Sequence, residues 1–412
     1  MCQASCAARR IAALGAVTIL SVGQLACGGR PTVPTSVEVL DSSGISIVIN
    51  RGAPKNLARW RTEPTLTIGE VNGPEEYSFG RIADVDRNAR GDLYVLDRQT
   101  QQATVYGPDG RYRFRIGRRG EGPGEFSQQV TTIRVGPSDS IAILDYWQRR
   151  LNVYAPTGEP VRTVPLRLGR QGPYDFHWMD DGRLLVRWFT YNVNPDGRFV
   201  PWDALLVSDR GQSLFDTLLV FAYTPPDVGD LNRLLRPMLA NAAFYDVLAD
   251  GQFIWSTLEG DQITLHNPDG SLQRVVRNAG WRRRALMPHD HQALERVYRA
   301  GAGHPDDPIP DNVVFPDSVP TITAVRASPD GGFWVQRMGA LAEAEPDGLF
   351  LALEPSLVGG SRWEVYDADG RWYATVEVPH RFRVTRVRDS TVVGVQRNDL
   401  DVERVVVLRV IR

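Results

Sequence analysis

Residues 104–126 read TVYGPDGRYRFRIGRRGEGPGEF, and this stretch decides the fold. Two β-rich runs flank the turn Pro-Asp-Gly, and a glycine-rich segment, GRRGEGPGEF, follows at 117–126. Glycine accepts a positive φ at little steric cost, so the turn suits a tight hairpin between antiparallel strands. The glycine-rich segment has two interpretations, a loop that cradles phosphate or a connection between sheets.

The hairpin pattern recurs along the chain, with similar units that begin at Asn152, Leu205, Thr264 and Glu364. Each unit follows another hairpin, as in IADVDRNARGDLYVLD at 82–97. Two hairpins in series make a four-stranded antiparallel meander of about 40 to 50 residues, which is the size of a propeller blade. The repeats predict blades at residues 79–126, 127–170, 172–222, 243–280 and 320–379.

The C-terminal residues 381–411 supply only three further strands, which would leave an open sheet edge. The early strand around Leu66 and Ile68 is predicted to be the fourth strand of this last blade, which would close the ring. The fold class is therefore all-β, a six-bladed β-propeller. A seventh blade is the alternative if the hairpin at 37–49 joins the ring.

The segment GEGPGEF, the hairpin VYGPDGRYRFRIG and the strand LYVLD together resemble NHL-type six-bladed propellers of bacteria, in which such glycine-rich segments link successive blades. The resemblance covers nearly all of the chain after residue 36 and is clearest in the first two blades. It implies a propeller and little about activity. The phosphate interpretation is not supported, because Glu125 stands where a dinucleotide motif needs glycine and Pro123 lacks an N–H group.

The N-terminus predicts export. An uncharged apolar run follows Arg9 and Arg10 and is too short to span a membrane, which indicates a signal peptide at 1–26. LACGG then resembles a bacterial lipobox, so Cys27 is the predicted lipid anchor, and 27–36 is a tether to a single domain at 37–412. The expected location is the cell envelope, on a membrane. A secreted or periplasmic soluble protein is the alternative if ordinary signal peptidase cleaves the chain.

Two motifs are weak candidates for metal sites. DVDRNARGD at 84–92 spaces Asp84, Asp86 and Asn88 like a calcium loop, but Ala89 and Val95 occupy positions that need glycine and glutamate, so turn chemistry is favoured. His289 and His291 fall in a predicted helix at 288–301, with Asp290 as its N-cap, and residues two apart on a helix diverge.

Other features have structural interpretations. WRRRAL at 281–286 is favoured as a solvated face over a contact for an acidic polymer. Most of the scattered aromatic residues are expected to pack between blades: Tyr146, Trp147, Trp178, Trp188, Trp255, Trp334 and Trp363. Insertions at 223–242, 281–319 and 339–361 exceed what blade turns need, and we expect some of them to gather over one end of the channel.

Two functions of different classes remain. The favoured one is a non-enzymatic, monomeric binding module whose loop face holds a protein, peptide or glycan, without cofactor or catalytic residues. A formal net charge of −2 argues against nucleic acid as a partner. The alternative is a metal-dependent hydrolase or lyase, resembling the lactonases and amidating lyases with six blades. Its metal would need several converging His, Asp or Glu side chains, and none of the six histidines matches a motif.

Overall fold

A computed structural model describes the folded unit, which comprises Ser36–Arg412. The described residues are 36–127, 129–166, 172–193, 199–210, 214–222, 236–237, 243–257, 260–301, 308–309, 313–315, 317–341 and 359–412. The predicted signal peptide, Cys27 and nearly all of the tether therefore lie outside the described residues. So do most of the predicted insertions at 223–242 and 339–361.

The first three blades are four-stranded antiparallel meanders in chain order. Blade 1 consists of β4 (Ile82–Arg87), β5 (Leu93–Asp97), β6 (Gln102–Tyr106) and β7 (Tyr112–Ile116). Blade 2 consists of β8 (Val130–Val135), β9 (Ile141–Asp145), β10 (Arg150–Tyr154) and β11 (Pro160–Pro165). Blade 3 consists of β12 (Gly172–Trp178), β13 (Leu184–Val193), β14 (Phe199–Ser208) and β15 (Phe215–Ala222).

Blade 4 carries two extra strands from the start of the folded unit. Its own strands are β17 (Ala243–Val247), β18 (Phe253–Thr257), β19 (Gln262–His266) and β20 (Leu272–Asn278). The hairpin of β1 (Val37–Ser42) and β2 (Ile45–Asn50) adds to the outer edge, where β2 pairs in parallel with β20. The hairpin at 37–49 therefore extends blade 4 and forms no seventh blade.

Blades 5 and 6 are joined by one long strand. Blade 5 consists of β24 (Ile322–Ala327), β25 (Phe333–Met338), β26 (Gly359–Tyr366) and β27 (Trp372–Glu377). Blade 6 consists of β28 (Phe382–Arg388), β29 (Thr391–Arg397) and β30 (Glu403–Ile411). The strand β3 (Ala58–Ile68) pairs in parallel with β27 through its first residues and antiparallel with β30 through the rest.

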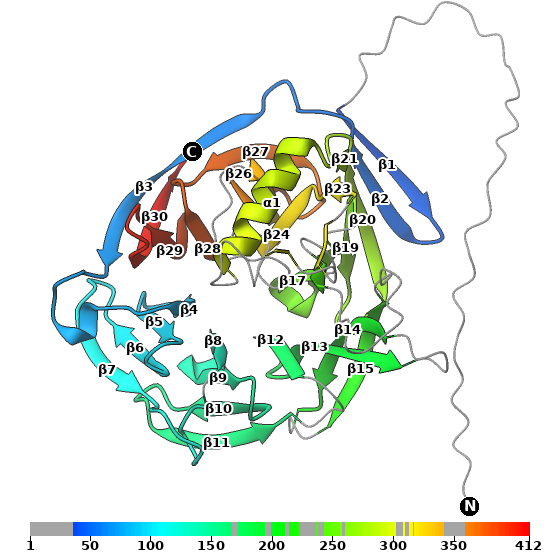
Figure 1. Cartoon of the computed structure of the whole chain (residues 1–412). Coiled ribbons are helices and arrows are strands. Elements are labelled where there is room, and N and C mark those ends of the chain that lie inside the picture. The colour runs from blue at the N-terminus through cyan, green and yellow to red at the C-terminus, as the bar shows by residue number, and fades with distance from the viewer. Residues whose placement is uncertain are drawn as a thin grey trace, which may run out of the picture. The chain divides into compact units, whose positions relative to one another are not determined.

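This pairing confirms the predicted closure of the ring. Leu66 lies opposite Val407 and Ile68 opposite Val405, so β3 supplies the missing fourth strand of the last blade. The first strand of every blade contacts the first strands of both neighbouring blades, including β28 against β4. The folded unit is thus a ring of six blades (Figure 1), as the repeats predicted.

Apolar burial between neighbouring blades holds the ring together. Six hydrophobic clusters each join two consecutive blades. The cluster between blades 6 and 1, for example, combines Ile68, Val405 and Val407 with Val85 and Leu93. Face-to-face burial of this kind is the main source of stability available to a chain with no cysteine after Cys27.

The segment GRRGEGPGEF is the connection from blade 1 to blade 2. Gly117 and Gly124 have φ values of 71° and 73°, a region in which residues with a Cβ are strained. Phe126 is fully buried in the cluster between the two blades. The carboxylate of Glu125 accepts the N–H of Gly122 at 2.9 Å, so the loop's own side chain takes a donor that a phosphate would need. The segment is therefore a connection between blades and not a phosphate-binding loop.

The helix α1 (Pro288–Gly301) forms in the predicted segment and ends at Gly301, but it begins before the predicted N-cap. Its buried residues Leu294 and Val297 pack on Val319 and Leu341, beside blade 5. Asp290 lies in the first turn, not at the N-cap as predicted, and accepts the N–H of Met287 at 2.9 Å together with hydrogen bonds from Arg284. The side chain of Asp290 thus provides a partner for the N–H of Met287, which has no partner within the helix.

Short strands accompany the helix. β21 (Arg284–Ala285) pairs with β23 (Ser318–Val319), and β16 (Arg236–Pro237) pairs with β22 (Val313–Val314). Within the described residues, none of the helices has the length and apolar character required to cross a membrane.

Candidate functional site

The two ends of the channel differ because of the strand order. In each antiparallel blade the first strand begins at one end of the ring, and the chain returns to that end before it enters the next blade. The long connections of the chain, 223–242, 279–321 and 339–358, all leave from strands that end at this side. We call it the loop end, and the opposite side, where first strands turn into second strands, the turn end.

Charged side chains line the channel on the first strands. Val85, Ile133 and Val325 on these strands are buried in the clusters between blades, and charged residues beside them line the channel. The channel-lining charged residues and histidine of the first strands are Asp84 and Asp86 on β4, Arg134 on β8, Asp175 and His177 on β12, Asp246 on β17, Arg326 on β24, and Arg383, Arg386 and Arg388 on β28.

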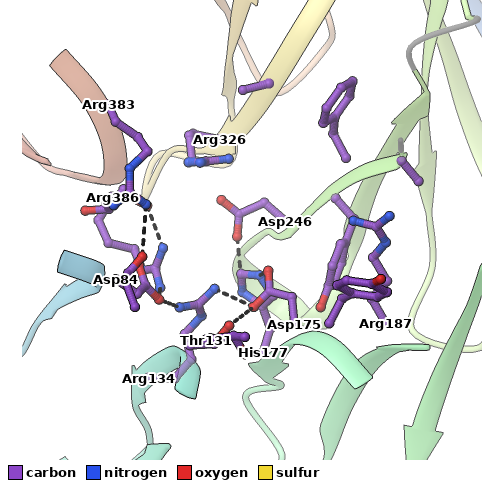
Figure 2. A pocket seen from close by; sticks show the side chains of 18 of the residues that line it. Asp84, Thr131, Arg134, Asp175, His177, Arg187, Asp246, Arg326, Arg383 and Arg386 are labelled. Carbon is purple, nitrogen blue, oxygen red and sulfur yellow. Dashed lines mark hydrogen bonds and ion pairs between the residues drawn. The ribbon is translucent and has the colours of Figure 1, made fainter. Parts of the chain in front are cut away.

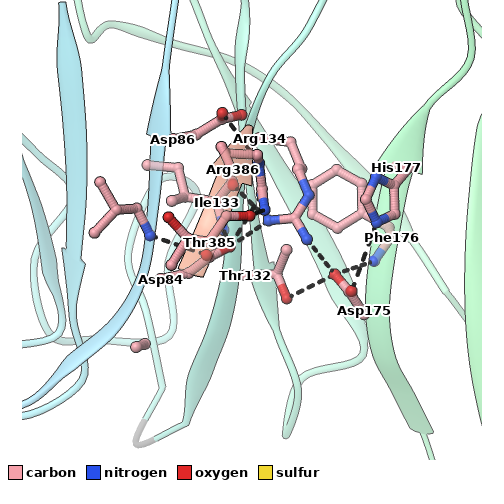
Figure 3. Close-up of polar contacts among 12 residues, drawn as sticks. Asp84, Asp86, Thr132, Ile133, Arg134, Asp175, Phe176, His177, Thr385 and Arg386 are labelled. Atoms are coloured by element: carbon pink, nitrogen blue, oxygen red, sulfur yellow. Dashed lines mark hydrogen bonds and ion pairs between the residues drawn. The ribbon is translucent and has the colours of Figure 1, made fainter. Parts of the chain in front are cut away.

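Arg134 is the centre of the contacts among blades 1, 2 and 3 (Figure 3). Its guanidinium donates to Asp84 of blade 1, and its Nη2 donates to Asp175 Oδ1 of blade 3 at 2.8 Å. Asp84 and Asp86 also accept the backbone N–H groups of Ile133 at 3.2 Å and Val135 at 2.8 Å. The carboxylates of blade 1 therefore hold both the side chain and the backbone of blade 2.

The contacts continue around the ring. His177 Nδ1 of blade 3 lies 3.2 Å from Asp246 Oδ1 of blade 4, and Asp246 Oδ2 accepts the N–H of Ala327 of blade 5 at 2.9 Å. Arg326 Nε of blade 5 donates to the carbonyl of Val384 in blade 6 at 3.1 Å.

Blade 6 completes the circuit. Arg383 donates to the carbonyls of Ile82 and Ala83 in blade 1, and Arg386 Nε donates to Asp86 Oδ1 at 3.2 Å. Every junction between neighbouring blades is thus bridged by a polar side chain at the axis. We call this set of contacts the polar circuit.

The environment shifts the pKa values of several members of the polar circuit. Burial by itself would raise the pKa of Asp175, but the Arg134 guanidinium and His177 hold it well below its usual range. Burial likewise opposes ionisation of Asp86, and Arg386, Arg388 and Arg134 lower its pKa. Both carboxyl groups are therefore ionised at neutral pH.

The arginines divide into two classes. Burial opposes the charge of Arg134, but Asp175 and Asp84 raise its pKa above the ordinary value. Burial lowers the pKa of Arg326 to about 10, although Asp246 raises it by more than Arg386 lowers it. Arg134 pairs directly with Asp84 and Asp175, whereas Arg326 has no carboxylate in ion-pair contact among the described residues.

Two cavities occupy the channel. The loop-end cavity has a volume of about 190 Å³, and the turn-end cavity has about 520 Å³. Four residues line both of them, namely Arg134, His177, Asp246 and Arg386. The polar circuit therefore lies at the level where the two cavities adjoin, and Figure 2 shows its side chains from blades on opposite sides of the axis pointing inward.

Two buried hydroxyl groups of the loop-end cavity make no hydrogen bond with the described residues. They are Tyr245 Oη, on a side chain only 5% exposed, and Thr131 Oγ1. Burial and the charge of Asp175 raise the pKa of Tyr245 well above its ordinary value, so its hydroxyl keeps its proton. Buried polar groups without partners are uncommon in native proteins and call for an explanation.

The structure places the predicted site residues apart from one another. Asp84 and Asp86 face the channel, and only Asn88 lies in the turn, where its N–H donates to Asp92 O at 3.1 Å. His289 is exposed, and His291 lies 3.1 Å from Glu295 and packs on Phe315. In the part of the chain that the structure describes, no three His, Cys, Asp or Glu side chains form a group able to hold a metal ion.

Two interpretations of surface residues change. Trp281 is buried, and its Nε1 donates to Glu364 at 2.9 Å, so WRRRAL begins with an anchor residue, although Arg282 and Arg283 are exposed as expected. Trp147 is 63% exposed and is an exception among the aromatic residues, most of which were expected to pack between blades. Trp188, Trp255, Trp334 and Trp363 are buried as predicted.

The polar circuit was missed from the sequence, although a signal was present. Each predicted first strand carries a charged residue among apolar ones, as in IADVDR, TTIRV, YDFHW, FYDV, ITAVRA and VTRVR. Charges on a strand that is buried on both faces indicate that the strand edge lines a channel.

Comparison with known proteins agrees with this architecture. The model of the DUF5128 family, described as "6-bladed beta-propeller", matches residues 72–214. No curated protein matches the sequence.

Solved structures resemble the whole ring. A Bacteroides fragilis protein described as exported is 13% identical, with a TM-score of 0.52, over 89% of this chain and 100% of its own. A Bacteroides vulgatus protein is 10% identical, with a TM-score of 0.53, over 92% of this chain and 99% of its own. Virginiamycin B lyase from Staphylococcus aureus is 8% identical, with a TM-score of 0.44, over 86% of this chain and 100% of its own. This likeness is too distant to bear on activity. By its sheets and by these likenesses, the chain is a six-bladed β-propeller.

Proposed function

We propose that this protein is an exported binding module of the cell envelope, held at a membrane by lipid on Cys27, that binds its ligand at the loop end of the channel. Export and anchoring rest on the N-terminal sequence, with its apolar run and LACGG. The ligand is a small molecule or a projecting group of a peptide, glycan or protein.

One observation carries the proposal. The loop-end cavity lies at the end of the ring from which the long connections leave, and its wall residues Tyr245 and Thr131 have buried hydroxyl groups without partners among the described residues. Leaving such a group unpaired costs about 1–3 kcal/mol, a cost that a ligand with suitable acceptors removes. Long loops on a rigid scaffold are also a common place for binding.

Binding is favoured over metal-dependent catalysis because the channel carboxylates already have partners. Asp84, Asp86, Asp175 and Asp246 accept hydrogen bonds from arginine side chains or from backbone N–H groups of neighbouring blades. These carboxylates link neighbouring blades by hydrogen bonds.

The test uses the full-length lipidated chain in detergent, incubated with peptides and glycans released from purified envelopes. Mass spectrometry then identifies what co-elutes with wild type, with the double variant Thr131→Val and Tyr245→Phe, and with Trp147→Ala as a control outside the channel. We expect one ligand to be enriched on wild type and on the control and to be depleted on the double variant. Equal enrichment on all three proteins, or none on wild type, would contradict the proposal.

Two further measurements accompany this test. Metal analysis of the same protein addresses catalysis, since a stoichiometric divalent cation would favour the hydrolase or lyase alternative. Cys27→Ser is expected to move the protein from the membrane fraction to the soluble fraction, and an unchanged distribution would refute the lipid anchor.

A further inference from the structure

The loop-end cavity has a surplus of positive charge. Its wall holds six arginines and three aspartates, an excess of three positive charges in a chain with a formal net charge of −2. The arginines are Arg98, Arg134, Arg187, Arg326, Arg383 and Arg386, and the aspartates are Asp84, Asp175 and Asp246. Clefts lined by one sign of charge concentrate ligands of the opposite sign.

Most of these arginines have their donors engaged by carboxylates or by backbone carbonyls. Arg134 and Arg386 bind the carboxylates of the polar circuit, and Arg187 Nη2 donates to the fully buried Asp203 at 2.7 Å. Both terminal nitrogens of Arg383 donate to backbone carbonyls, those of Ile82 and Ala83.

Arg326, like Arg383, has neutral partners, but it differs in keeping one terminal nitrogen without a partner among the described residues. Its Nε and Nη1 donate to the carbonyls of Val384 and Val325 at 3.1 and 2.8 Å, and within the described residues it has no carboxylate in ion-pair contact. Those bonds leave its Nη2 without a partner among the described residues. The lowered pKa of Arg326 reflects burial, which the charges of Asp246, Asp175 and Asp84 only partly offset.

The wall of the cavity therefore carries a guanidinium with one unpartnered terminal nitrogen and two hydroxyl groups without partners among the described residues. Arg326 comes from blade 5, the Tyr245 hydroxyl from blade 4 and the Thr131 hydroxyl from blade 2. The carboxylates that share the wall are occupied: Asp175 by Arg134 and Thr132, and Asp246 by two backbone N–H groups and His177.

We propose that the loop-end cavity binds an anionic oxygen group, a carboxylate or a phosphate, with its charge at Arg326 and with further acceptor atoms at Tyr245 and Thr131. This inference rests on the proposed function and names the chemistry of its ligand. The volume of about 190 Å³ is below the roughly 300–1,000 Å³ typical of sites for drug-sized ligands. The cavity thus suits a small acid or the acidic end of a larger ligand.

The test compares acids with neutral molecules of the same shape. Thermal shift and calorimetric titration of the full chain at pH 7 and low salt would use succinate against succinamide, and inorganic phosphate against dimethyl sulfone. We expect the acids alone to stabilise wild type in a saturable manner, and high salt to weaken their binding. The stronger of succinate and phosphate identifies the source as carboxylate or phosphate.

Variants locate the site. We expect Arg326→Met to lose at least about tenfold in affinity, Arg326→Lys to retain part of it, and Tyr245→Phe to lose several-fold. Arg111→Met, at a side chain 88% exposed on a blade 1 hairpin, is the control and should match wild type.

Several results would overturn the anion proposal: no binding of any acid at millimolar concentration, equal binding of neutral analogues, or unchanged affinity in Arg326→Met that folds normally. If envelope ligands still depend on Tyr245 and Thr131 but not on Arg326, the binding module stands and only the anion proposal fails. If neither acids nor envelope ligands bind wild type, both proposals fail.

Discussion

Arg134 Nη2 lies 2.8 Å from Asp175 Oδ1, which joins the first strands of blades 2 and 3 at the axis of the ring. This ion pair is one step of a polar circuit that passes through all six blades. Breaking a buried pair by removing one partner is usually costly, because the remaining charge loses its compensation.

Asp175→Asn tests this pair through its pH dependence. The pKa of Asp175 in the folded protein lies below the ordinary 3.8, so its ionisation stabilises the fold above about pH 4. That stabilisation is lost as the pH falls toward the folded pKa. We expect the melting temperature of Asp175→Asn to be lower than that of wild type at pH 5–8, by an amount that shrinks below pH 4. Asp109→Asn, at an exposed turn, is the control, and a difference that grows in acid would refute the assignment.

His177 and Asp246 should be energetically coupled across blades 3 and 4. Their side chains are 3.2 Å apart, and Asp246 also holds the N–H of Ala327. A double-mutant cycle with His177→Ala and Asp246→Ala, measured by urea unfolding, should give a coupling energy of about 0.5–3 kcal/mol. A cycle that pairs Asp246→Ala with Asp109→Asn should give a value near zero. Equal values in the two cycles would argue against the polar circuit.

Closure of the ring depends on Ile68, which is 3% exposed between blades 6 and 1. We expect Ile68→Ala to lower the free energy of unfolding by about 2–5 kcal/mol, since it opens a cavity in that cluster. The neighbouring Thr67, exposed on the same strand, gives the control variant Thr67→Ala, with an expected change within about 0.5 kcal/mol. Comparable losses from both would show that β3 contributes by its backbone alone.

The glycine-rich connection can be tested with two glycines of similar φ. A Cβ on Gly117 would lie 2.1 Å from the Phe126 ring, whereas a Cβ on Gly182 would meet nothing within 4 Å. Gly182→Ala should cost about 1–2 kcal/mol for its positive φ alone. Gly117→Ala should cost at least about 1–3 kcal/mol more, because Phe126 must move. Similar chemical denaturation midpoints for the two variants would contradict the packing role.

The fold was predictable because its information is local and repeated. Turn residues and alternating apolar residues recur with each hairpin, and the three-stranded tail called for a partner such as β3. The parallel pairing of β2 with β20 was not predictable, since nothing near residue 45 specifies which outer edge it joins.

The candidate site could not be assembled from sequence for a related reason. Asp84 resembled a turn residue, and Arg134 and Arg326 looked like ordinary strand charges, because each appears once in its own blade. They converge only through the rotation that relates six blades. Tyr245 gave no signal at all, since its unpaired hydroxyl is a property of the folded channel.

The pairing of β3 also sets an order of events during synthesis. β3, which joins blades 5 and 6, is synthesised early, and its partner β30 is synthesised after the other strands of the ring. Until β30 has been synthesised, the edge of β3 that pairs with it stays unpaired, and an exposed edge of this kind makes an incompletely folded chain prone to aggregation.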